Sequence, residues 1–223
     1  MSTSEHTNTT ANPVPADLSP RSDLLGHRLP LRQDLPGAKE NVVIECTPGE
    51  RFGLRGPGTI DWVAAQGLAV PAAVNTSELS PCGTMVLRLG QQEVLLTAPV
   101  GDGGQRLRDL RQAWHDSTMA VKGYDAYRDE GWAWFVVSGP DAPALMRRIS
   151  MADLGPKNLA FKDVAQTRGL HMDVVVARLD RFGAVSYDIF LDIASAKFAL
   201  DVLEETARKL DAGFGISALR AAA

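Results

Sequence analysis

The clearest hydrophobic pattern lies at the start of the second half of the chain. Residues 132–137 (Trp-Ala-Trp-Phe-Val-Val) are a continuous apolar run of strand length, and they lead directly into Ser-Gly-Pro-Asp-Ala at 138–142. Such a run bounded by turn residues predicts a strand. We expect Ser138 to cap the helix that follows, with Leu145 and Ile149, four residues apart, facing the core.

The remainder of the second half predicts two strands and a long helix. Residues 172–179 and 185–193 are apolar runs around a short turn, and the second alternates with a period of two. A helix is predicted from Ser195, with Gly213 at the position after its end, and residues 214–219 form the last predicted strand. The predicted apolar stripe of this helix is Phe198, Ala199, Val202, Leu203, Ala207 and Leu210.

The first half follows a similar order with weaker periodicity. Thr59 is expected to cap its first helix, and two apolar runs separated by Gly90-Gln91-Gln92 predict a β-hairpin. The predicted elements are strands at 41–46 and 52–55, a helix at 59–67, strands at 84–89 and 93–97, a helix at 107–114 and a closing strand at 119–124.

Each half therefore has the order β-α-β-β-α-β of a ferredoxin-like unit. The predicted fold class is α+β, with two tandem ferredoxin-like units. We place the first unit at residues 41–125 and the second at 126–223. Two such units can join their sheets around one core.

The first 40 residues have a different composition. Residues 1–16 are rich in Ser, Thr, Asn and Pro, and we expect a disordered tail because their apolar area is too small to offset the entropy lost on ordering. They lack the basic and apolar regions of a secretory signal, so we expect a cytoplasmic protein. Residues 18–37 contain spaced leucines and prolines and predict an extended arm. This arm either crosses a neighbouring surface or packs on its own domain.

Composition excludes some classes of function. The net charge of -4 over 223 residues argues against a nucleic-acid binder, and no apolar run approaches the roughly 20 residues that cross a bilayer. Cys46 and Cys82 have no zinc or redox spacing, so we interpret them as two small buried hydrophobic residues, with a reactive thiol or a disulfide as the alternative.

The sequence shows no familiar catalytic constellation. The four histidines are scattered, at positions 6, 27, 115 and 171, and no pair has ligand spacing, so no metal site is predicted. There is no Walker A loop, nucleophile elbow or Rossmann glycine motif. We therefore predict no catalytic residue in this chain.

A few residues admit two interpretations. Asp153, in a loop, is either a base or a capping residue, and Asp188, on the strand face opposite the apolar stripe, faces solvent, a partner or a ligand. These two carboxylates are the candidates for a ligand site. Trp132 and Trp134 share one strand face and either pack in the core or form an apolar docking surface.

These residues resemble a known family. Residues 137–142 (Val-Ser-Gly-Pro-Asp-Ala), followed by Leu145 and Asp153-Leu154, resemble the folate-binding aminomethyltransferase superfamily, and within it the small gamma subunit of heterotetrameric sarcosine oxidase. The likeness covers roughly residues 40 to 215. Its other segments are Leu54-Arg55-Gly56, Leu87-Arg88-Leu89-Gly90, Leu95-Leu96-Thr97-Ala98-Pro99 and Tyr187-Asp188-Ile189-Phe190-Leu191.

The resemblance implies a role within a complex. Such complexes oxidatively demethylate an N-methyl amino acid, with flavin chemistry in the beta subunit and folate handling in the alpha subunit. The implied partners are alpha, beta and delta subunits, which carry FAD, FMN, NAD, tetrahydrofolate and zinc. The gamma chain has the folate-enzyme fold, binds no folate itself and acts as a structural partner.

The chain departs from the family pattern at three places. It has Ala152-Asp153 where the transferases carry Asn-Asp, and residues 181–186 where they carry Gly-Tyr-Thr-Gly-Glu. At the entry to the last helix it has Ala194-Ser195-Ala196-Lys197-Phe198-Ala199, where gamma chains often have Arg-Ser-Phe-Ala. Independent aminomethyl transfer is therefore not expected, and the departures are consistent with a relative that demethylates another N-methylated amine. The alternative hypothesis is a stand-alone tetrahydrofolate-binding one-carbon protein, with a pocket bordered by Asp153 or Asp188.

Overall fold

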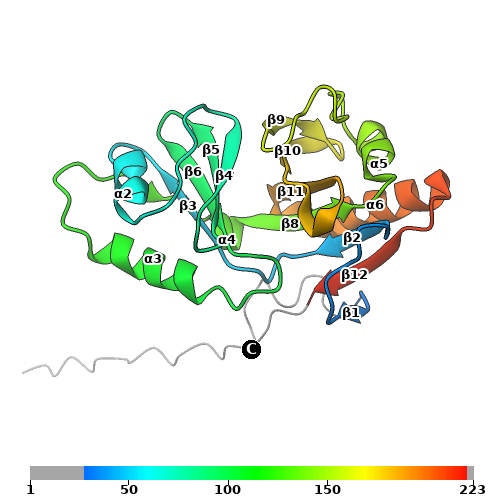
Figure 1. The fold of residues 1–223 in the computed structure, drawn as a ribbon, viewed down its shortest axis with the longest axis horizontal. Helices are drawn as coiled ribbons and strands as arrows, with labels where there is room; N and C mark the ends of the chain where they lie inside the picture. Colours follow the sequence, from blue (N-terminus) through cyan, green and yellow to red (C-terminus); the bar gives the residue numbers. More distant parts are fainter. Residues whose placement is uncertain (1–27, 220–223) are drawn as a thin grey trace, which may run out of the picture.

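The described chain is built as four layers, helix, sheet, sheet, helix (Figure 1). The structure, a computed structural model, describes residues 28–219. One apolar core lies between a seven-stranded sheet and the helices α5 (Ala142–Ile149) and α6 (Ala196–Leu210), and a second lies between the two sheets. A third lies between a five-stranded sheet and the helices α2 (Thr59–Ala65) and α3 (Gln105–Asp116). The predicted α+β class is confirmed.

The seven-stranded sheet combines five strands from the second half of the chain with two from the first half. Its order is β1 (Leu31–Arg32), β12 (Gly215–Leu219), β2 (Val42–Glu45), β8 (Trp132–Ser138), β11 (Ser186–Asp192), β10 (Met172–Arg178) and β9 (Val164–Gly169). The pairs β1–β12 and β12–β2 are parallel and the others are antiparallel. The helices α5 (Ala142–Ile149) and α6 (Ala196–Leu210) cover one face.

The five-stranded sheet carries the first half. Its order is β4 (Thr76–Leu79), β5 (Met85–Gly90), β6 (Glu93–Thr97), β3 (Arg51–Arg55) and β7 (Tyr124–Asp125). The helices α2 (Thr59–Ala65) and α3 (Gln105–Asp116) pack on its outer face, and the short helix α4 (Arg128–Gly131) leads into β8. The predicted hairpin is present as β5 and β6, whereas the closing strand is only two residues long.

Each sheet contains the strand order expected of a ferredoxin-like unit. The order is β7-β3-β6-β5 in the first sheet, with β4 added at the edge. In the second sheet it is β12-β8-β11-β10, with β9 added at the edge and β2 inserted between β12 and β8. The insertion follows from sequence, because Val42, Val43 and Ile44 are apolar on both strand faces and all three are buried.

Several predicted helix ends are wrong. Gly58, in the left-handed conformation, is the N-cap of α2, so Thr59 is already the first helical residue. Ser138 does not cap α5; it is the last residue of β8, paired with Ser186, and the N-cap is Asp141. The end of α6 comes earlier than predicted, because Asp211 takes the left-handed position that we assigned to Gly213.

The apolar stripe of α6 is displaced from the predicted one. Ala199, Leu203 and Ala207 are buried as predicted, and Ala196 and Leu200, which the prediction omitted, are buried as well. Phe198 is exposed and contacts His171. A phenylalanine at the rim of the stripe satisfies the helical period without reaching the core.

Part of the predicted arm packs on its own chain. Leu29 is buried in the core under α5 and α6, and β1 pairs with β12, while Leu31 and Leu35 are exposed. The predicted disordered tail and the histidines at 6 and 27 lie outside the described residues.

Candidate functional site

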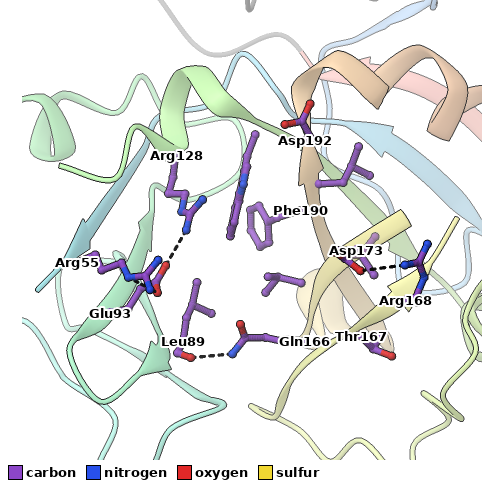
Figure 2. A pocket seen from close by; sticks show the side chains of 14 residues that line it. Arg55, Leu89, Glu93, Arg128, Gln166, Thr167, Arg168, Asp173, Phe190 and Asp192 are labelled. Carbon is purple, nitrogen blue, oxygen red and sulfur yellow. Dashed lines mark hydrogen bonds and ion pairs between the residues drawn. The ribbon is translucent and has the colours of Figure 1, made fainter. Parts of the chain in front are cut away.

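An open cleft of about 810 Å³ lies between the two sheets (Figure 2). One wall comes from β3, β5, β6 and α4 of the five-stranded side, and the other comes from β8, β9, β10 and β11. The cleft thus lies where the two ferredoxin-like units meet.

The floor of the cleft is aromatic. The rings of Trp132 and Phe190 lie 6.2 Å apart, and Phe190 stacks on Trp134 at 5.8 Å. The Arg128 guanidinium lies over Trp132, 4.0 Å from the ring centre, in a cation–π contact. Gly53 permits this arrangement, because a Cβ on Gly53 would overlap the Arg128 side chain. The floor is therefore held by packing from both units.

The wall from the five-stranded side carries two cations and one anion. Arg128 Nη2 lies 2.7 Å from Glu93 Oε1, and Arg55 Nε lies 3.5 Å from Glu93 Oε2. Both arginines share this carboxylate (Figure 2). Arg55 is more than half exposed and makes the longer contact, so it remains accessible to an added anion.

The opposite wall carries two anions, Asp173 and Asp192, and one cation, Arg168. Arg168 lies 3.7 Å from Asp173, which is almost fully exposed, and Asp192 accepts a hydrogen bond from the Ala194 N–H at 2.9 Å. The two walls are joined by Gln166, whose Nε2 donates to the Leu89 carbonyl at 2.7 Å (Figure 2).

Asp188, a predicted ligand candidate, is fully buried between the sheets. Its carboxylate accepts hydrogen bonds from Arg181 Nε and Nη2, at 2.8 and 2.9 Å, and from Trp134 Nε1 at 2.9 Å. Burial alone would lower the pKa of Arg181, but the adjacent Asp188 charge and hydrogen bonds outweigh it and raise the pKa. This carboxylate is therefore engaged in a buried ion pair.

Asp153, the other candidate, lies in an exposed loop after α5. Its oxygens accept hydrogen bonds from the Gly155 N–H at 2.9 Å and from Asn158 Nδ2 at 2.7 Å, which shapes a turn. Neither Asp153 nor Asp188 lines the cleft. The structure thus places the two candidates in separate environments.

The two cysteines differ. Cys46 is buried, and burial raises the pKa of its thiol well above the usual value. Cys82 is exposed, so its interpretation as a buried hydrophobic residue is wrong. The pKa of the Cys82 thiol is lowered: slight burial would raise it, but the hydrogen bonds with Thr84 outweigh burial.

Within residues 28–219 no group of three or more His, Cys, Asp or Glu side chains is arranged to hold a metal ion.

Sequence reasoning missed the cleft residues. Arg55, Glu93 and Arg128 come from β3, β6 and α4, and no spacing along the chain connects them. For Trp132 and Trp134 the sequence left core packing and a docking surface as alternatives; Trp134 is buried, whereas Trp132 is partly exposed and lines the cleft. Among the described helices none is long and apolar enough to cross a membrane.

This chain matches known proteins by structure and not by sequence. No protein-family model and no curated protein sequence matches the chain. A chain of heterotetrameric sarcosine oxidase from Corynebacterium sp. U-96 matches with a TM-score of 0.63 and 24% identity, over 86% of this chain and 94% of that chain. The glycine cleavage system aminomethyltransferase T from Bartonella henselae matches with a TM-score of 0.56 and 16% identity. That match covers 80% of this chain and 48% of the transferase.

Identities this low establish the shared fold alone. The fold extends over nearly the whole sarcosine oxidase chain and about half of the aminomethyltransferase. The chain therefore has the α+β fold that these two proteins share, as the sequence resemblance implied.

Proposed function

We propose that this chain is a small structural subunit, of the gamma type, in a heterotetrameric flavin-dependent sarcosine oxidase-like complex. The complex would oxidatively demethylate an N-methyl amino acid or a related N-methylated amine. The observation that carries the proposal is the end-to-end match with a chain of a heterotetrameric sarcosine oxidase, which covers 94% of that chain. The two chains are thus similar in length as well as in fold.

In such a complex the partner subunits would carry out the chemistry. Alpha, beta and delta subunits would carry FAD, FMN, NAD, tetrahydrofolate and zinc in the cytoplasm, and this chain would contribute surface and rigidity. The engagement of Asp188 with Arg181 and Trp134 supports that role, because this carboxylate is committed to a buried ion pair within the seven-stranded sheet. Arg51 also contributes rigidity, because its guanidinium donates to the backbone carbonyls of Thr47, Gly49, Asp129 and Trp132 and so links the segment before β3 to the segment around α4.

Purification of the tagged full chain from its native source tests the proposal. We expect larger flavin-bearing chains to co-purify in a fixed ratio, and the purified complex to consume oxygen when sarcosine or another N-methylated amine is added. Recovery of the chain as a flavin-free monomer would contradict the proposal.

The alternative function is tetrahydrofolate binding by the chain alone. The match with an aminomethyltransferase favours it, although this chain spans only 48% of that enzyme. Titration calorimetry of the isolated chain with tetrahydrofolate should then show saturable heat that is lost in Asp153→Ala or Asp188→Asn. Binding heat that is unchanged in both variants, or no binding heat at all, would exclude tetrahydrofolate binding at these two residues.

A further inference from the structure

We propose that the cleft between the sheets is the docking site for a polypeptide segment of a partner subunit. The segment would present an apolar or aromatic anchor side chain flanked by an acidic residue on one side and a basic residue on the other. This inference rests on the proposed function and adds the place and chemistry of the contact.

The arrangement of polar groups favours a polypeptide over a small ligand. Small-molecule sites hold a few polar groups that converge on the ligand from an apolar lining. Here the charged groups are paired along the rim, Arg128 with Glu93 and Arg168 with Asp173, while Trp132 lies in the floor. An apolar centre within a polar rim is the anatomy of a protein–protein contact.

The floor offers a site for one anchor. Trp132 is only partly buried, and the buried side chains of Leu89, Val175 and Phe190 line the same cleft. Tryptophan and arginine are the residue types most enriched among those that dominate binding energy. The stacked pair of Trp132 and Arg128 therefore provides a preformed contact surface, with its arginine already ordered.

The two walls differ in charge, which sets the flanking residues. On the β3–β6 wall, Arg55 and Arg128 face one carboxylate, Glu93, which leaves one positive charge in excess. On the opposite wall, the carboxylates of Asp173 and Asp192 line the cleft together with one cation, Arg168, which leaves one negative charge in excess. A partner segment that matches this polarity places its acidic residue beside Arg55 and its basic residue beside Asp173.

Charge reversal in the assembled complex tests the polarity. Each tagged variant, Arg55→Glu or Asp173→Lys, is produced in the native source together with untagged wild-type chain. The variant and the wild-type chain then compete for the flavin-bearing chains. We expect each variant to be recovered with those chains about tenfold less than the tagged wild-type chain. Arg148→Glu, an exposed arginine on α5 across the larger sheet, and Asp61→Lys on α2 are the matched controls and should compete equally. Circular dichroism and thermal unfolding confirm that the variants fold.

Crosslinking identifies the occupant. A photoreactive benzophenone residue at Arg168, whose side chain lies on the cleft face of β9 beside Asp173, should crosslink to a flavin-bearing subunit through a segment with an apolar anchor, as read by mass spectrometry. A complex that contains those subunits but gives no such crosslink, a crosslink to a second copy of this chain, or full competition by both variants would overturn the inference. Saturable binding of tetrahydrofolate or sarcosine that Arg55→Glu abolishes would do so as well. If even the wild-type chain recovers no flavin-bearing partner, the proposed function fails first and the docking site fails with it.

Discussion

At the scale of single residues, Arg51 shows how a buried charge can serve structure. Its side chain is fully buried, and its guanidinium donates to the backbone carbonyls of Thr47, Gly49, Asp129 and Trp132 at 2.7–2.9 Å. These carbonyls belong to the segment before β3 and to the segment of α4 that enters β8. One side chain thereby fixes the path of the chain between the two sheets.

Arg51→Lys should therefore be strongly destabilising. A lysine ammonium has three donors on one nitrogen and cannot reproduce the planar fork, so buried carbonyls lose their partners. Each such loss costs about 1–3 kcal/mol, and we expect the free energy of unfolding to fall by at least about 2 kcal/mol in urea denaturation. Arg148→Lys, at an exposed position on α5, is the control and should leave it unchanged. Equal stability of the two variants would refute this role of Arg51.

Glu45 introduces a pH dependence of stability. Burial raises the pKa of this carboxyl above its ordinary value of 4.5, although hydrogen bonds from Thr47 and the charge of Arg51 oppose the change. The folded state then holds the proton more tightly than the unfolded state, so stability falls as pH rises from 4.5 through the folded-state pKa. The loss is about 1.4 kcal/mol for each unit by which the pKa is raised.

Glu45→Gln tests this dependence. The amide oxygen can still accept the hydrogen bond that Glu45 Oε1 receives from the Thr47 N–H, but the side chain no longer ionises. We expect the variant to gain stability relative to wild type above pH 4.5, with the difference absent at lower pH. Urea denaturation over a pH series gives the difference curve, and a flat curve would show that Glu45 titrates normally.

At the scale of elements, the turn between β8 and α5 explains the motif at 138–142. Gly139 has a φ of +123°, and a Cβ there would overlap the Glu40 carbonyl and the Asn41 backbone. The Asn41 side chain accepts a hydrogen bond from the Asp141 N–H and donates to the Asp141 carboxylate and the Ala212 carbonyl. The glycine thus allows the start of β2, the start of α5 and the end of α6 to meet.

Gly139→Ala should destabilise the protein by at least about 2 kcal/mol, since it adds a steric overlap to the cost of an unfavourable φ. Gly67→Ala separates the two effects, because Gly67 also has a positive φ, +75°, but has open space around its Cβ position. We expect Gly67→Ala to cost only about 1 kcal/mol. Urea denaturation measures both variants, and similar losses would mean that the contact with Asn41 is unimportant.

The elements themselves were largely predictable, and the contacts between them were not. The apolar runs at β8, β10 and β11 and the hairpin of β5 and β6 appear at the predicted positions, because period and turn residues are local properties. The end of β8 was misjudged because Ser138 pairs with Ser186 in the sheet, which overrides its preference for a helix cap. The cleft depends on which strands meet across the two sheets, and no local pattern encodes that.

At the scale of the whole molecule, β2 ties the two halves together. It precedes the whole first sheet in sequence, yet it lies between β12 and β8 in the second sheet. Its residue Ile44 packs in the core between the sheets, and Val43 packs in the core beneath α5 and α6. The boundary between the two units near residue 125 stays a prediction. The seven-stranded sheet contains strands from both sides of that boundary.

The second unit should consequently fail to fold without β2. A fragment of residues 126–223 lacks Val42, Val43 and Ile44, each of which contributes about 1.5–3 kcal/mol on burial, a total comparable to the stability of a domain. We expect this fragment to show no cooperative thermal transition by circular dichroism. A peptide of residues 28–47 added in trans should restore one, whereas the same peptide with Ile44→Asp should not, because its carboxylate would be buried between the sheets. A cooperative transition in the fragment alone would instead mean that β12 pairs directly with β8, and that β2 is an addition to an autonomous ferredoxin-like unit.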